Sequence, residues 1–202
     1  MTPPRRKRRS QRAELRTVLL VTNGRVTENA YLQQLCRRVN HDGISAKVKV
    51  IKGDPLTVVK QLGGPRSDLS EYEEVWIVVD HDGRDRHDFL AKCRRLSSKR
   101  TVVHGVVSVP CFEVWLNAHY VPVKNYQNQA DAQTHYRELT GLSSKDAKML
   151  PDDFPWDRGS QAAARCHLPT DSLPETDTQG PCPSTTMPHL LCSLGLLSAD
   201  EL

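Results

Sequence analysis

The chain has 202 residues, of which 38% are hydrophobic, and a formal net charge of +4. This length suits one well-buried α/β domain and is too short for two large ones. No window approaches the roughly 18 consecutive apolar residues of a membrane span, and the basic start is not followed by the apolar core of a signal peptide, so we expect a cytoplasmic protein without a membrane partner.

Positive charge is concentrated at the start of the chain. Residues 1–16 hold seven Arg or Lys and one acid, which gives this segment a net charge of +6. Since the whole chain carries +4, residues 17–202 carry a net charge of −2. Such an arm can neutralise the phosphates of a nucleic acid, serve as a nuclear address in a eukaryote, or be a solvated flexible tail. The candidate nucleic-acid-binding residues are Arg5, Arg6, Lys7, Arg8, Arg9 and Arg12.

From residue 17 onward the pattern predicts a strand followed by a helix, four times over. Apolar β-branched runs are typical of strands, and apolar residues three or four apart are typical of helices. The alternation predicts an α/β fold with a four-stranded, mainly parallel sheet covered by helices. The expected strands are 17–22, 44–51, 75–80 and 101–109, and the expected helices are 27–39, 54–62, 86–98 and 110–120.

Three of these helices carry start signals. Thr27 is available to cap the first helix, and Asp54 stands before Pro55 at the start of the second. Pro110 suits the first turn of the fourth helix, because its missing N–H needs no partner there. We therefore expect helix starts at these positions.

Beyond residue 125 the pattern predicts a helical, Pro/Ser/Thr-rich extension that packs on the core. The expected pieces are a helix at 129–140 ended by Gly141, a short helix at 143–150 capped by Ser143 or Ser144, an extended loop with little core at 169–188, and a short docking helix within 187–202. The chain thus divides into a basic flexible arm (1–16), an α/β core (17–125) and the extension (126–202).

Acidic residues follow the predicted strands. Asp80 and Asp82 come directly after the buried third strand, Glu113 follows the fourth strand and its Ser108, and Glu28 follows the first strand. Ligands of a parallel sheet bind beyond the carboxyl ends of its strands, so these acids are expected at one edge. Gly83 supplies a turn that lets the two aspartates converge.

These acids form a candidate magnesium or manganese site. Hard oxygen ligands favour Mg²⁺ or Mn²⁺, and the six scattered cysteines form no zinc-binding pattern, so a structural zinc site is not predicted. The alternative is that the acids cap helices: Asp82 or Asp85 the third helix, and Glu113 the fourth.

Three stretches resemble, in order and spacing, the signatures of the RloB-like family of bacterial restriction-linked and abortive-infection proteins. They are VLLVTNGRVTENAYLQQL, YEEVWIVVDHDGRDRHDFLAKC and SVPCFEVWLNAHY, and the late CPSTTMPHLLCSL is similar to the family's closing Pro-Ser-Thr segment. The resemblance covers about residues 17–197, and its Pro-Cys-Phe-Glu-x-Trp stretch is the most specific part.

The resemblance implies a compact Toprim-like fold, found in topoisomerases, primases and nucleases of the overcoming-lysogenization type. It implies Mg²⁺ held by a glutamate after the first strand and an Asp-x-Asp after the third, and an ATPase partner protein encoded nearby. No Walker loop occurs in this chain, so ATP hydrolysis would belong to that partner. His119 matches a histidine of the family, and with Ser108 it is a candidate supporting residue.

Two positions depart from the family pattern. Asn23 stands where the family usually carries glutamate, and Val109 stands where it tends to have asparagine. An amide oxygen can ligate a metal, but it brings no charge and cannot act as a base near neutral pH. The change should weaken Mg²⁺ binding, unless Glu28, further along the chain, compensates.

Three functions follow from these patterns. The first is a Mg²⁺-dependent nuclease-like protein of an anti-phage defence or restriction-linked system, with Asp80, Asp82, Glu113 and Glu28 as catalytic residues and Asn23 as a further metal ligand. The second is a weakened or inactive nucleic-acid-binding or scaffold member of the same family. The third is another Asp-x-Asp enzyme, a sugar-nucleotide transferase or a dehalogenase-type phosphatase, for which the surrounding motifs fit poorly. DNA or RNA as the target, and the oligomeric state, stay open.

Overall fold

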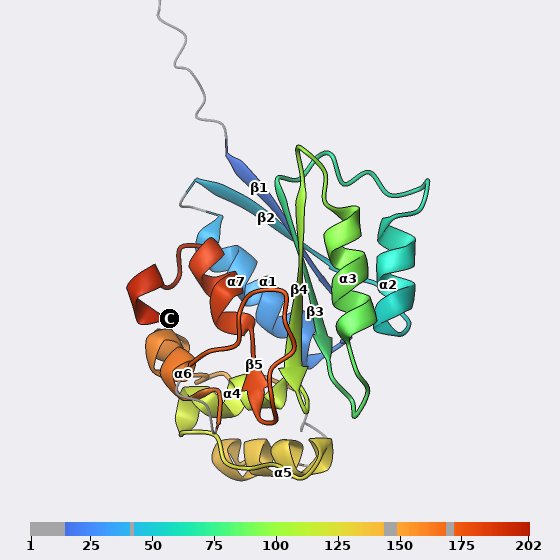
Figure 1. Ribbon diagram of the computed structural model, residues 1–202. Coiled ribbons are helices and arrows are strands. Elements are labelled where there is room, and N and C mark those ends of the chain that lie inside the picture. The colour runs from blue at the N-terminus through green and yellow to red at the C-terminus, as the bar shows by residue number, and fades with distance from the viewer. Residues whose placement is uncertain (1–14, 41–42, 144–148, 169–171) are drawn as a thin grey trace, which may run out of the picture.

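The computed structural model describes residues 15–40, 43–143, 149–168 and 172–202 (Figure 1). The six candidate nucleic-acid-binding residues of the arm, and most of the helix expected at 143–150, lie outside the described residues. No helix in the described ranges has the length and apolar character needed to cross a membrane.

A single five-stranded sheet forms the centre of the fold, in the order β2-β1-β3-β4-β5. The four longer strands are parallel, which confirms the predicted alternation of strands and helices. Their carboxyl ends therefore meet at one edge of the sheet. The strands are β1 (Arg16–Thr22), β2 (Ile44–Val50), β3 (Glu74–Asp80), β4 (Val102–Val109) and β5 (Ser184–Thr185).

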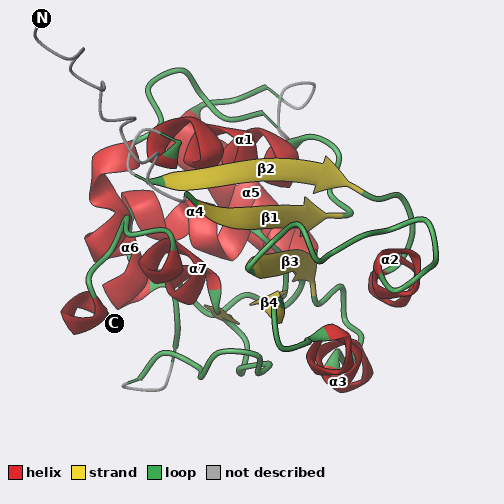
Figure 2. Cartoon of the chain, turned by 90° about the horizontal axis from the view of Figure 1, so that it is seen from above, coloured by secondary structure: helices red, strands yellow, loops and turns green. Residues whose placement is uncertain are grey.

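Helices cover both faces of the sheet (Figures 1 and 2). On one face, α2 and α3 pack on Leu19, Ile77 and Val107. On the other, α1, α4, α5, α6 and α7 share a larger core with Leu20 and Val78. The helices are α1 (Thr27–Val39), α2 (Pro55–Leu62), α3 (His87–Leu96), α4 (Glu113–Tyr120), α5 (Gln129–Thr140), α6 (Gly159–Arg165) and α7 (Met187–Ser193), with short 3-10 turns η1 (Trp156–Arg158) and η2 (Ala199–Glu201).

The fifth strand corrects the prediction of four. β5 pairs antiparallel with β4, with Ser108 opposite Thr185 and Val109 opposite Ser184. Residues 183–188 are buried, so the extended loop with little core expected at 169–188 is wrong at its end. A two-residue strand is too short to show a period in the sequence, and only its pairing with β4 reveals it. The predicted docking helix is confirmed as α7.

The helix starts were predicted with mixed success. Asp54 caps α2 as expected, since its side chain accepts the Thr57 N–H at 2.9 Å, and Gly141 ends α5 in the left-handed conformation. Thr27 is not a cap but the first residue of α1, after Val26. Pro110 is also outside its helix: the Val109–Pro110 peptide is cis, and α4 begins only at Glu113. A cis bond leaves no mark in composition, so the sequence could not indicate this turn.

Candidate functional site

The candidate site lies at the carboxyl edge of the sheet, where β1, β3 and β4 end side by side. Thr22, the last residue of β1, is in register with Val78, and Asp80, the last residue of β3, is in register with Ser108. The loops after these strands carry the predicted acids. The parallel register therefore brings to one edge three segments that are far apart in the chain, since Asp80 lies 58 residues after Thr22 and 28 residues before Ser108.

Asp80 is held in one orientation by the start of α4. Its Oδ1 accepts a hydrogen bond of 2.7 Å from the backbone N–H of Phe112, the residue before α4. Arg86 Nε donates to the backbone carbonyl of the same aspartate at 2.8 Å. The Asp80 carboxylate, at the end of β3, thus accepts a backbone N–H at the start of α4, as a helix cap does. The capping role suggested for Glu113 is not observed.

Negative charges surround Asp80. Burial first, then the charges of Glu28, Glu113 and Asp82, raise the pKa of the Asp80 carboxyl well above its usual range, and the Phe112 hydrogen bond opposes them. Glu113 is buried at the first position of α4, and Glu28 lies in the first turn of α1. Asp80, Glu28 and Glu113 are called the acid cluster below.

Gly24 is a residue of this site that the sequence reasoning missed. A Cβ atom at this position would lie 2.0 Å from Cδ and 2.1–2.3 Å from the carboxylate oxygens of Glu28. The Glu28 carboxylate therefore rests directly on the Gly24 backbone, and only a residue without a side chain leaves room for it. The sequence analysis singled out Asn23 as a metal ligand but not Gly24, although a glycine four residues before an acid was a usable signal.

Asp82 lies at the margin of the acid cluster. It adopts a left-handed backbone (φ 50°), followed by Gly83 (φ 69°), so the predicted turn is present. Its carboxylate lies 3.7 Å from Arg86 Nη2, and 44% of the side chain is exposed. Among the three acids that act on Asp80, its charge has the smallest influence.

Asn23 contacts the loop between β2 and α2. Its Nδ2 donates to the Gly53 carbonyl at 3.2 Å. Together with Asp82 and Arg86 it lines a cavity of about 340 Å³ that also includes Gly53, Asp54, Pro55 and Arg84. The structure thus brings Asn23 and Asp82 together in one cavity.

The two candidate supporting residues have different surroundings. Ser108 lies beside Asp80 in the register, fully buried, and its hydroxyl is 2.7 Å from that of Thr185. This contact ties the site to β5. The hydrogen bond between Ser108 and Thr185 is therefore a buried polar contact directly next to Asp80.

His119 lies in an aromatic cluster of the core, about 9 Å along α4 from Glu113. Its Nδ1 donates to the Pro155 carbonyl at 3.2 Å, and the Tyr31 hydroxyl is 3.4 Å from Nε2. Burial lowers the pKa of His119 to about 4. It is therefore a neutral, hydrogen-bonded core histidine at physiological pH.

The donor chemistry of the edge suits a hard divalent cation. Within the described ranges, no three His, Cys, Asp or Glu side chains are already arranged as a ligand set. The acid cluster nevertheless offers carboxylate oxygens whose mutual repulsion a cation would relieve, and such oxygens are the ligands of Mg²⁺ and Mn²⁺. Burial and the charges of Glu113 and Asp80 raise the pKa of the neighbouring Cys111 thiol, so it offers no thiolate to a softer metal.

Comparison with known proteins gives one match. The family model described as RloB-like protein matches residues 18–194, which is most of the chain and includes every residue of the acid cluster. Neither a curated protein nor a solved structure matches the chain.

Proposed function

The chain belongs to the RloB-like family, and from this premise we propose that it is a Mg²⁺-dependent, nuclease-like protein that cleaves phosphodiester bonds at the acid cluster. The observation that carries the proposal is the raised pKa of Asp80 beside two further acids at the carboxyl edge of a parallel sheet. Perturbed carboxylates gathered at such an edge are typical of a functional site. We take the arrangement to be Toprim-like.

Each residue of the acid cluster has a role in this proposal. Asp80 and Glu113 would hold the cation, with Asp82 and Asn23 contributing from the adjoining cavity. A bound divalent cation polarises a scissile phosphate and lowers the pKa of a bound water. Asp80 is oriented for this by the Phe112 N–H, and Glu28, placed by Gly24, would accept the proton of the attacking water.

The wider setting is also proposed. We infer a role in a bacterial anti-phage defence or restriction-linked system, with an ATPase as partner protein and DNA or RNA as the target. This setting rests on the resemblance of three sequence stretches to the signatures of restriction-linked and abortive-infection proteins. The acid cluster itself supports only the chemistry.

A second candidate is a nucleic-acid-binding or scaffold protein with little or no turnover. The observation in its favour is Asn23, whose amide adds no charge and whose Nδ2 is used by the Gly53 carbonyl. A site short of one carboxylate binds Mg²⁺ weakly. The two candidate functions share the acid cluster and differ in whether that cluster catalyses phosphodiester cleavage.

Metal titration and a nuclease assay test the proposal. We expect weak or no cleavage by the unmodified protein alone with Mg²⁺, and stronger metal binding and cleavage by Asn23→Glu, measured by calorimetry and with labelled DNA and RNA. In that background Asp80→Asn should weaken Mn²⁺ binding by about tenfold or more, because one carboxylate charge is lost.

Glu138→Gln, an exposed acid of α5, is the matched control and should change nothing. Asn23→Glu protein that binds metal but never cleaves would favour the scaffold candidate. Mg²⁺-dependent cleavage that survives Asp80→Asn would place the chemistry elsewhere.

A further inference from the structure

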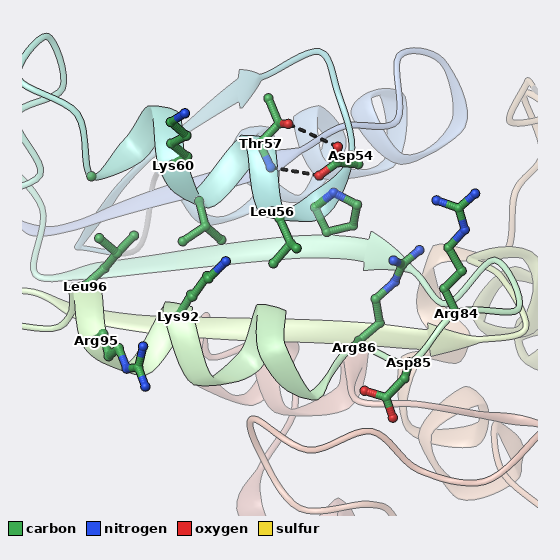
Figure 3. A pocket seen from close by; sticks show the side chains of 13 residues that line it. Asp54, Leu56, Thr57, Lys60, Arg84, Asp85, Arg86, Lys92, Arg95 and Leu96 are labelled. Atoms are coloured by element: carbon green, nitrogen blue, oxygen red, sulfur yellow. Dashed lines mark hydrogen bonds between the residues drawn. The ribbon is translucent and has the colours of Figure 1, made fainter.

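A groove of about 800 Å³ lies between α2 and α3, on the face of the sheet opposite α1 (Figure 3). Its charged lining consists of five basic and two acidic side chains, a balance of +3. Its floor is apolar, with Leu56, Val59 and Leu96 among its members. The charged residues are Lys60, Arg84, Arg86, Lys92, Arg95, Asp54 and Asp85.

The two acids do not neutralise this charge. Asp54 accepts two hydrogen bonds from Thr57 at the start of α2, and Asp85 accepts from the His87 N–H and contacts its ring at 2.5 Å. In the part of the chain that the structure describes, no carboxylate forms an ion pair with Lys60, Arg84, Lys92 or Arg95. The positive charge of the groove is therefore available to a ligand.

The basic side chains are arranged along the groove. In Figure 3, Arg84 and Arg86 extend side by side from the loop after β3, and Lys92 reaches from α3 toward Leu56 of α2. Lys60 and Arg95 stand toward the outer margins. An extended anion lying along the groove would meet Lys92 first and the arginine pair at the end nearest the sheet edge.

The groove continues into the cavity beside the acid cluster. Arg84 and Arg86 line both, and so do Asp54 and Pro55, while the second cavity adds Asn23 and Asp82. Arg86 also joins the groove to the site directly, through its hydrogen bond to the Asp80 carbonyl. A chain of anionic groups bound in the groove would thus be led to the carboxyl edge.

We propose that the α2–α3 groove binds the sugar-phosphate backbone of a nucleic-acid strand and delivers it to the acid cluster. Guanidinium groups hold phosphates by two parallel hydrogen bonds, and an ammonium holds them as a point charge. The apolar floor suits sugar and base surfaces between the phosphates. This role rests on the proposed function, because it is the phosphodiester chemistry at the adjoining edge that favours a nucleic acid over an acidic protein.

Salt-dependent binding tests the groove without any cleavage. Fluorescence anisotropy of the full-length protein is measured with labelled single-stranded DNA and RNA 20-mers in EDTA, for the wild type and for Arg84→Gln/Lys92→Gln. Losing two phosphate contacts should flatten the slope of log affinity against log salt by about 1.4, so that between about 50 and 200 mM salt the wild type loses about sevenfold more affinity than the variant. The DNA and RNA arms distinguish the two sources of the backbone.

A control removes the same charge elsewhere. Arg37→Gln/Lys47→Gln lies on exposed positions of α1 and β2, outside the groove, and should change the slope much less. Equal slopes for the two double variants, both folded by circular dichroism, would overturn the groove proposal. Displacement of the labelled strand by poly-glutamate as readily as by unlabelled oligonucleotide would also overturn it, in favour of an acidic protein.

The outcomes separate the groove from the proposed function. If Asn23→Glu protein shows no metal-dependent cleavage but the groove variant still loses binding, the chemistry fails and the groove stands. If cleavage depends on Asp80 but the groove variant binds like its control, the groove fails and the chemistry stands. Arg84→Lys keeps the charge and should retain the salt slope, which distinguishes charge loss from local damage.

Discussion

At the scale of single residues, the acid cluster depends on the absence of a side chain at Gly24. We predict that Gly24→Ala displaces the Glu28 carboxylate, because a Cβ would lie about 2 Å from it. The backbone at this position is not in the left-handed region, so alanine itself is tolerated. Metal binding should therefore weaken while the free energy of unfolding changes by no more than about 1 kcal/mol.

The pKa of Asp80 provides a second readout of the same change. The charge of Glu28 helps to raise this pKa, so moving or removing that charge should lower it toward its ordinary value. Gly24→Ala and the matched Glu28→Gln should therefore shift the Asp80 titration in the same direction, as followed by carboxyl NMR. An unchanged Asp80 pKa in both variants would contradict the assignment of Glu28 to the cluster.

His119 should make stability depend on pH. Its pKa is lowered from 6.5 to about 4 in the folded protein, so between these values the unfolded state binds more protons than the folded state. The stabilisation is fully present above about pH 6.5 and is lost as the pH falls toward 4, by up to about 3 kcal/mol.

Replacing His119 by asparagine checks this expectation. Asparagine keeps a donor for the Pro155 carbonyl but does not titrate. Urea unfolding at pH 7 and near pH 4.5 should show a smaller loss of stability for His119→Asn than for the wild type. A loss of the same size in both proteins would show that His119 does not control this range.

At the scale of elements, the segment that follows residue 171 is held on β4 by Asp177. One carboxylate oxygen accepts the Gly105 N–H at 2.7 Å, the other lies 2.9 Å from His104 Nδ1, and Arg94 donates to the Asp177 carbonyl at 3.2 Å. Because β5 pairs with the last two residues of β4, this contact covers a further part of that strand edge, at His104 and Gly105.

We predict that Asp177→Ala destabilises the protein by about 1–3 kcal/mol, because the buried Gly105 N–H loses a charged partner. Asp177 has a positive φ of 60°, which asparagine tolerates well, and its amide oxygen can still accept that N–H. Asp177→Asn should therefore cost much less in a denaturant titration. Equal losses for the two variants would mean that the hydrogen bond to Gly105 is not what holds the segment.

At the scale of the whole molecule, charge is divided between the arm and the rest of the chain. Deleting residues 2–12 removes six basic residues and no acid, which changes the net charge from +4 to −2. We predict weaker nucleic-acid binding with a flatter salt dependence, since fewer counterions are released. Anisotropy titrations at several salt concentrations measure both quantities, and unchanged affinity and slope would leave the arm as a tail or an address.

The sequence by itself determined the repeated strand–helix order, the parallel sheet, the family, and the placement of acids after the first, third and fourth strands. These are local properties: a buried parallel strand must be apolar throughout, and a covering helix must be apolar on one face. Asp80 ends such a strand, and Glu28 and Glu113 lie six and four residues after the ends of theirs. The Asp54 cap and the Gly141 helix end were predicted for the same reason, because each depends on neighbours within four residues.

Only the tertiary structure decided which acids lie around Asp80. The charges of Glu28 and Glu113 raise the pKa of Asp80 more than the charge of Asp82 does, although Asp82 is nearest in the chain. The reason is the turn at Gly83, which directs the Asp82 carboxylate toward Arg86. The tertiary structure also added β5 and placed His119 in the aromatic core. It formed the basic groove from α2 and α3, which are separated by 24 residues of chain. Each of these contacts joins residues distant in sequence, and packing, which fixes such distances, leaves no period or spacing in a single sequence.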